Sequence, residues 1–143
     1  MNKYEKKLTE HQHQAIVITW FDEFCTITPE FAHLYGKLAS VPNGAFLAGN
    51  AGRRAAQMNK LKAEGLRPGY PDLQLLWPCG SYHGLLIEMK KNQKSTPREN
   101  QEEWLDFFCR AGYFATVCVG HTEAEDVIKW YLTEQDNGGL SAQ

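Results

Sequence analysis

The residues best suited to chemistry are two carboxylates and one amine, Asp72, Glu88 and Lys90. Glu88 and Lys90 stand two positions apart, and side chains alternate between the faces of a strand, so both point to the same face. Glu88 directly follows the apolar run 85–87, and an acid in a mostly buried strand requires a partner. The spacing therefore indicates a polar site at the end of a buried strand.

A hairpin would bring Asp72 to the same point. Residues 72–77 and 85–90 have the composition of strands, and the segment 78–84, centred on Gly80, reads as the reversal between them. In this register Gln74 pairs with Leu86, and Asp72 faces Glu88 with Cβ atoms about 4.5–5.5 Å apart. Facing carboxylates are unfavourable unless a pKa rises or a cation binds.

Converging oxygen ligands suit Mg²⁺ or Mn²⁺, which keep several waters and accept one or two carboxylates together with phosphate oxygens. Lys90 can orient a water, help to deprotonate it, or neutralise the charge that builds on a reacting phosphorus. The structural alternative makes Asp72 a strand-start residue after a turn and leaves Glu88 and Lys90 exposed on a sheet edge. The joint arrangement of the three residues favours the chemical interpretation.

Caps, breakers and periodicity predict the elements that position these residues. We expect helices over 10–24, 28–39, 53–64, 97–110 and 122–132, and extended segments over 41–47, 72–77, 85–90 and 113–119. Ile16, Trp20 and Phe24 mark the apolar side of the first helix, and Thr96 and Thr122 are the expected caps of the last two. The continuous run 113–119 is typical of a central strand covered on both sides.

This order predicts an α/β fold, with a mixed sheet flanked by helices, in one domain over residues 1–143. The end of the chain, 133–143, is expected to fray. No apolar run approaches the roughly 20 residues of a membrane helix, and the charged start does not resemble a signal peptide. We therefore expect a cytoplasmic protein without a membrane partner.

Several other kinds of site are disfavoured. The four cysteines are scattered singly, which favours reduced, mostly buried thiols, and the five histidines lack paired zinc spacing. The glycine-rich segment 49–54 lacks the Gly-Lys-Ser/Thr ending of a nucleotide-binding loop, so no nucleotide cofactor is expected.

Basic residues gather locally although the net charge is −2. From 36 to 67 the chain carries six basic residues against one acid, and more follow after the second strand. Such a surface can bind a phosphate backbone while the remainder stays solvated. The candidates for phosphate contact are Asn43, Arg53, Arg54, Lys60, Lys91 and Lys94.

The sequence around these residues resembles a known family. Pro71-Asp72 with Glu88-Met89-Lys90 looks like the PD-(D/E)XK nuclease signature, and the surrounding sequence is similar to the VRR-NUC (virus-type replication-repair nuclease) family. The likeness covers about residues 5–132. The segments that carry it are 41–44, 61–72, 84–90, 100–104 and 111–113, and the run ending in Gly69-Tyr70-Pro71-Asp72 is the most specific.

The resemblance implies an αβββαβ restriction-endonuclease-like core that hydrolyses phosphodiester bonds with Mg²⁺ or Mn²⁺, leaving a 5′-phosphate and a 3′-hydroxyl. Carried over, Asp72 and Glu88 look like the metal ligands, joined by the backbone carbonyl of Met89, and Lys90 looks like the catalytic lysine. The same resemblance adds a glutamine and a first-helix acid to the site, at Gln101 and Glu10 respectively, with Glu5 near the latter.

Stand-alone members of this length resemble phage-encoded enzymes that resolve Holliday junctions as two-fold dimers, which would act in the host cytoplasm. A four-way junction requires two symmetric cuts and this chain supplies one site, so a homodimer would match the substrate. Shape and phosphate contacts are expected rather than base reading. The alternatives are an endonuclease that acts on flaps, one that reads sequence in duplex DNA, and a non-catalytic DNA-binding subunit.

Overall fold

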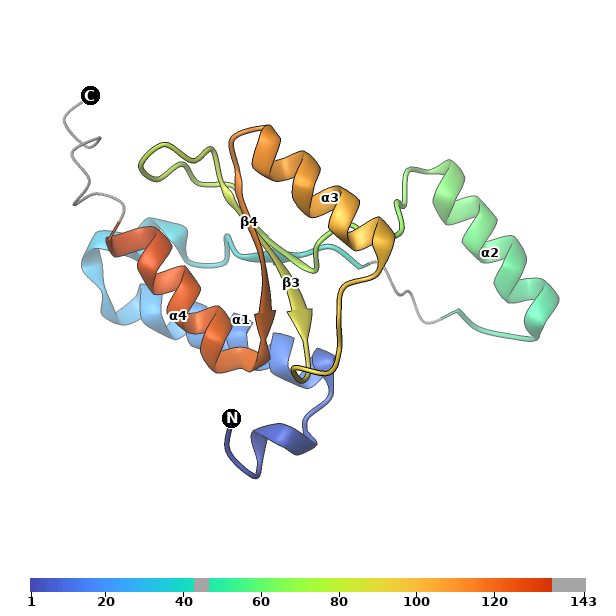
Figure 1. Ribbon diagram of the computed structural model, residues 1–143, viewed down its shortest axis with the longest axis horizontal. Coiled ribbons are helices and arrows are strands. Elements are labelled where there is room, and N and C mark those ends of the chain that lie inside the picture. The colour runs from blue at the N-terminus through green and yellow to red at the C-terminus, as the bar shows by residue number, and fades with distance from the viewer. Residues whose placement is uncertain (43–46, 135–143) are drawn as a thin grey trace.

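A four-stranded mixed sheet lies between helices in the computed structural model, which describes residues 1–42 and 47–134 (Figure 1). The strands are β1 Ala39–Ser40, β2 Leu73–Leu75, β3 Leu85–Lys90 and β4 Phe114–Val119, and they are ordered β1-β2-β3-β4. The α-helices are α1 Glu10–Ile27, α2 Ala51–Ala63, α3 Glu99–Arg110 and α4 Gly120–Thr133, and the short 3₁₀ helices are η1 Glu5–Lys7 and η2 Pro29–Leu34. Without α2, this order is the expected αβββαβ core followed by α4.

β3 is the central strand, and all six of its residues are buried. It pairs antiparallel with β2 and parallel with β4. Gln74 pairs with Leu86, which confirms the predicted hairpin register, and Gly80 at the reversal has a φ of 56° that favours glycine. The predicted strand 72–77 is too long, because only 73–75 pair with β3.

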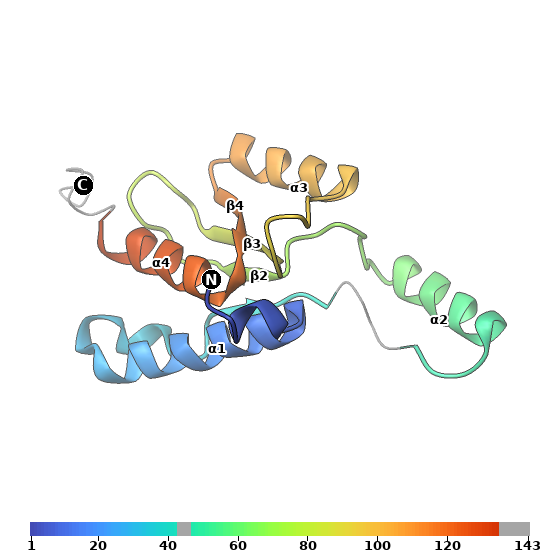
Figure 2. The same ribbon diagram turned by 60° about the horizontal axis from the view of Figure 1, so that its bottom comes forward.

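The two faces of β3 have different roles. Leu85, Ile87 and Met89 join the main apolar core, which α1 and α4 cover from one side of the sheet (Figure 2). The alternate side chains point toward α3 on the opposite side, and two of them, Glu88 and Lys90, hydrogen-bond to Gln101 of that helix. Strand alternation thus separates the apolar core from a polar face.

The first helix begins at residue 10 as predicted, with the Thr9–Gln12 capping box formed, and continues to Ile27. Its fully buried side chains are offset by one position from the predicted apolar stripe: they are His13, Val17, Phe21 and Cys25. The predicted stripe is only half-buried beside them. His13 belongs to the buried row because its ring hydrogen-bonds to the backbone of Glu5 and His121.

Other boundaries differ for local reasons. The second predicted helix is a 3₁₀ helix that ends at Leu34, and residues 39–40 form β1, because they pair with β2. The expected caps Thr96 and Thr122 are wrong: α3 begins at Glu99 with Arg98 as its cap residue, and α4 begins at Gly120 directly after β4. Arg98 donates its backbone N–H to the Gln101 side chain.

β4 is an edge strand, so the prediction of a central strand over 113–119 is wrong. The apolar run is explained by α3 and α4, which pack against opposite faces of β4 (Figure 2). Its outer edge stays unpaired in the described part of the chain. Cover on both faces therefore produces the same sequence signal as a central position.

The remaining composition predictions can be compared directly with the structure. Cys25, Cys79 and Cys118 are buried thiols and Cys109 is exposed, in line with the expectation of mostly buried cysteines. Within residues 1–42 and 47–134, no helix is long and apolar enough to cross a membrane. Most of the predicted tail, from residue 135 on, and Asn43 lie outside the described residues.

Gly69 fixes the approach of the segment before β2 to the start of α3. Its φ is +87°, and a Cβ there would lie 2.7 Å from the backbone of Asn100. We expect Gly69→Ala to lower the free energy of unfolding by about 1–3 kcal/mol more than Gly65→Ala, because overpacking adds to the backbone strain. Gly65 is the matched control, since its φ is +108° and a Cβ there would meet no atom within 4 Å. Denaturant titration measures both, and equal losses would contradict the close contact.

Candidate active site

Asp72 lies one residue before β2 and reaches across to β3. Its Oδ2 accepts a hydrogen bond of 2.8 Å from the backbone N–H of Met89. The bond continues the hairpin beyond the last paired residues, Leu73 and Ile87, which places Asp72 beside Glu88 as the register predicts. Because Asp72 is half-buried, its carboxylate, anchored to β3 by the hydrogen bond from Met89, stays partly open to solvent.

Glu88, Lys90 and Gln101 form one hydrogen-bonded network at the end of β3. Lys90 Nζ lies 3.1 Å from Glu88 Oε1 and donates to Gln101 Oε1 at 3.0 Å. Gln101 Nε2 donates to the same Glu88 oxygen. Glu88 is 2% exposed and Lys90 6%, which excludes the alternative of two solvated side chains on a sheet edge.

Gln101 connects this network to the start of α3. Its Oε1 also accepts the backbone N–H of Arg98 at 2.8 Å, so a single amide oxygen both caps the helix and accepts from Lys90. Loss of this side chain would leave the Arg98 N–H without its acceptor and the Lys90 ammonium with Glu88 alone. The structure therefore brings together Asp72, Glu88, Lys90 and Gln101.

Burial dominates the electrostatics of the two acids. It raises the pKa of Glu88 to about 7, and the nearby Asp72 charge adds to the rise, while Lys90 opposes it. Burial also raises the pKa of Asp72, although the hydrogen bond from Met89 acts in the opposite direction. The site thus favours a proton or another positive charge on its carboxylates.

The first-helix acid lies close enough to contribute to this field. Negative charge on Glu10 raises the pKa of both Asp72 and Glu88. Glu5 is engaged elsewhere: its carboxylate accepts from Thr122 Oγ1 at 2.9 Å and lies 3.2 Å from a ring nitrogen of His121. Of the two N-terminal acids, Glu10 is therefore the one whose charge affects the pKa values of the site carboxylates.

The donor set fits a divalent cation with few protein ligands. Glu88 Oε2 is buried and has no hydrogen-bond partner among the described residues, and such an oxygen is stabilised by a cation. In the described ranges no group of three or more His, Cys, Asp or Glu side chains could hold an ion alone. Two carboxylates completed by water, a backbone carbonyl and substrate oxygens are the arrangement that Mg²⁺ accepts.

The sequence assigned no role to Tyr70, although it lies in the most specific matching segment. Its hydroxyl donates to Gln74 Oε1 at 2.8 Å, and its ring packs edge-on against Trp104 and Phe108 of α3. Tyr70 therefore ties the strand that follows Asp72 to the helix that carries Gln101. Phe107 of the same helix is 56% exposed, and its ring contacts those of Trp104 and Phe108.

The predicted phosphate-contacting residues lie in two places outside the network. Lys91 and Lys94 are exposed in the loop after β3. The Asn92 side chain stabilises the turn of this loop by accepting hydrogen bonds from the backbone N–H groups of Lys94 and Ser95. The others with described positions, Arg53, Arg54 and Lys60, are exposed on α2.

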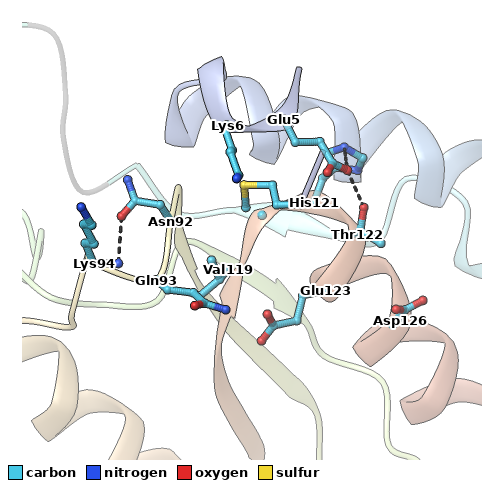
Figure 3. A pocket seen from close by; sticks show the side chains of 12 residues that line it. Glu5, Lys6, Asn92, Gln93, Lys94, Val119, His121, Thr122, Glu123 and Asp126 are labelled. Carbon is cyan, nitrogen blue, oxygen red and sulfur yellow. Dashed lines mark hydrogen bonds and ion pairs between the residues drawn. The ribbon is translucent and has the colours of Figure 1, made fainter. Parts of the chain in front are cut away.

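A cavity of about 950 Å³ opens beside this loop, where β4 ends and α4 begins (Figure 3). Lys6 and Lys94 line it together with acids such as Glu123 and Asp126, so its charge is mixed. Asp72, Glu88 and Lys90 are not among its lining residues. The chemistry of the buried network is therefore separate from this cavity.

Comparison with known proteins gives a family match over most of the chain. The model of the VRR-NUC domain matches residues 8–122. A solved structure titled VRR_NUC domain protein is similar, with a TM-score of 0.68 and 28% identity, over 87% of this chain and 88% of that one. Comparison with curated proteins finds no match.

The raised pKa of Glu88 predicts a pH-dependent stability without metal. Its carboxyl ionises near 4.5 ordinarily and near 7 in the fold, so deprotonation favours the unfolded chain. We expect wild type to lose about 2–3 kcal/mol of unfolding free energy from this group between pH 4.5 and 7, because one pKa unit is about 1.4 kcal/mol. Denaturant titrations in a chelator measure the loss. Glu88→Gln should lack this contribution, and identical pH profiles would contradict the assignment.

Proposed function

This chain belongs to the VRR-NUC domain family, a family of nuclease-type domains, and we propose that it is a divalent-metal-dependent endonuclease acting on branched DNA. The observation that supports the proposal most strongly is the meeting of Asp72, Glu88, Lys90 and Gln101 at the end of β3. Two acids, of which Glu88 has a buried oxygen without a hydrogen-bond partner among the described residues, and an amine beside them suit metal-assisted phosphodiester hydrolysis.

Asp72 and Glu88 would hold the Mg²⁺ or Mn²⁺ ion, with the Met89 backbone carbonyl and Glu10 as further candidates. When bound, the ion supplies positive charge beside the scissile phosphate and a lowered pKa of a coordinated water. Both acids must be ionised for this role, and the Lys90 ammonium favours ionisation of each.

Lys90 is the residue suited to donate a hydrogen bond to the attacking water or to a phosphate oxygen. Its Nζ is held by Glu88 and Gln101, so its position is fixed before substrate binds. An ammonium has three donors, which leaves one for an attacking water or a phosphate oxygen. Donation there orients the nucleophile or stabilises the charge that develops on the phosphorus oxygens.

Substitution of the network tests this assignment. We expect Asp72→Asn, Glu88→Gln and Lys90→Ala to slow Mg²⁺-dependent cleavage by about a hundredfold or more, since each removes a charge that the proposed metal ion or the reacting oxygens require. Glu103→Gln and Lys3→Ala, which change exposed charges elsewhere, are matched controls and should cleave like wild type. Single-turnover cleavage of labelled four-way junctions measures the rates.

The same assay on flap, single-stranded and linear duplex DNA separates the alternatives. Faster cleavage of junctions than of the other substrates supports the proposal. Equal cleavage of linear DNA at a fixed sequence would indicate a duplex-reading enzyme. Junction binding with no cleavage at any Mg²⁺ or Mn²⁺ concentration would indicate a non-catalytic subunit, and unimpaired variants would refute the site.

We also expect a homodimer that resolves Holliday junctions. One chain carries one network, and two symmetric cuts across a junction need two networks related by a two-fold axis. Light scattering should give twice the chain mass, and junctions labelled on each strand should be nicked at symmetry-related positions. A monomer on the junction that makes a single nick would contradict this expectation.

A further inference from the structure

Helix α2 projects away from the rest of the described chain in both views, on the side at which α3 begins (Figures 1 and 2). None of its 13 residues is buried. A helix in a globular protein is ordinarily held by an apolar face packed against a core, whereas the apolar side chains of α2 are at most half-buried, at Met58 and Leu61. Packing among the described residues therefore holds this helix only weakly.

The charge of α2 is concentrated and of one sign. It carries four cations and no carboxylate between residues 51 and 63, in a chain whose net charge is −2; they are Arg53, Arg54, Lys60 and Lys62. The two arginines lie in the first turn, where the helix dipole is already positive, which is unfavourable without an anion nearby.

The chain itself barely neutralises this charge. Within the described residues, the one ion pair of α2 joins Lys60 to Glu64 at 4.0 Å, and both side chains are more than half exposed. Such a pair contributes little. The cations of α2 are therefore available to an anionic partner.

We propose that α2 is a nucleic-acid-binding arm that contacts the phosphodiester backbone outside the cleavage site, an inference that rests on the proposed nuclease function. The arm, residues 51–63, is about 20 Å long at 1.5 Å per residue, so it can follow several phosphates. The small residues Gly52, Ala55 and Ala56 flank the two arginines and permit close approach of a backbone.

A polyanion fits α2 better than a protein partner does. The half-buried apolar side chains of α2 are Met58 and Leu61, and the turn that closes the helix returns Leu66 to Leu61, whose carbonyl accepts the Leu66 N–H at 2.9 Å. That leaves cations and small residues as the main exposed surface. Protein interfaces are instead depleted of lysine and rich in large apolar anchors.

DNA binding in a chelator tests the arm apart from cleavage. The full-length chain is titrated against a labelled four-way junction and a linear duplex at several KCl concentrations. We expect R53Q/R54Q/K60Q/K62Q to bind at least about tenfold more weakly and to lower the slope of log K against log [KCl] by about 2–4, close to one unit per lost phosphate contact. The control K3Q/K7Q/R110Q/K129Q removes four exposed cations elsewhere and should leave the slope within one unit of wild type.

A charge-preserving variant separates binding from folding of the arm. R53K/R54K/K60R/K62R should keep the wild-type slope, and far-UV circular dichroism should show equal helicity for all variants. An unchanged slope in the glutamine variant would overturn the proposal. So would a change in molar mass by light scattering with no change in slope, which would make α2 a protein interface. If the glutamine variant loses slope while the active-site variants still cleave, the arm is supported and the active-site assignment fails. If the glutamine variant keeps its slope while the active-site variants lose cleavage, the arm fails and the active site stands.

Discussion

Glu88 and Lys90 carry opposite charges at the buried end of β3, and the site depends on the partners that stabilise them there. Removing ions from water is costly unless each finds partners. Gln101 hydrogen-bonds to both charges, because its amide nitrogen donates to the Glu88 carboxylate and its amide oxygen accepts from the Lys90 ammonium. The second acid, Asp72, leaves the site with excess negative charge, which explains why burial and repulsion together raise the pKa of Glu88.

The sequence allowed the central part of this arrangement to be predicted because its signals are local. β3 was bounded correctly by its apolar run, and the alternation of side chains placed Glu88 and Lys90 on one face. The glycine at the reversal and the composition of both strands fixed the register that brings Asp72 to Glu88. Gly65 and Gly112, which follow α2 and α3, have the positive φ that is common where helices end.

The rest depends on contacts between segments that are distant in sequence. Thr96 has the form of a cap, but the Gln101 side chain, held by Lys90, caps α3 two positions further on. β4 was predicted to be central because helices on both faces give it the composition of an interior strand. His13 is buried because two backbone groups bond its ring, which no apolar periodicity reveals. The isolation of α2 likewise has no sequence signal, since good helix formers are found in packed helices too.

Asp72 and the three side chains of the network come from one continuous stretch, residues 72–101, and the loops that must close to assemble the site are short. Short loops lose little entropy on closure, and local contacts form rapidly during folding. The hairpin and the helix after it therefore assemble the site at a small cost in loop entropy, and α1 and α4 cover the opposite face of the sheet. Four of the candidate site residues thus lie within 30 positions of one another, and Glu10 of α1 is the one more distant residue whose charge raises the pKa of both acids.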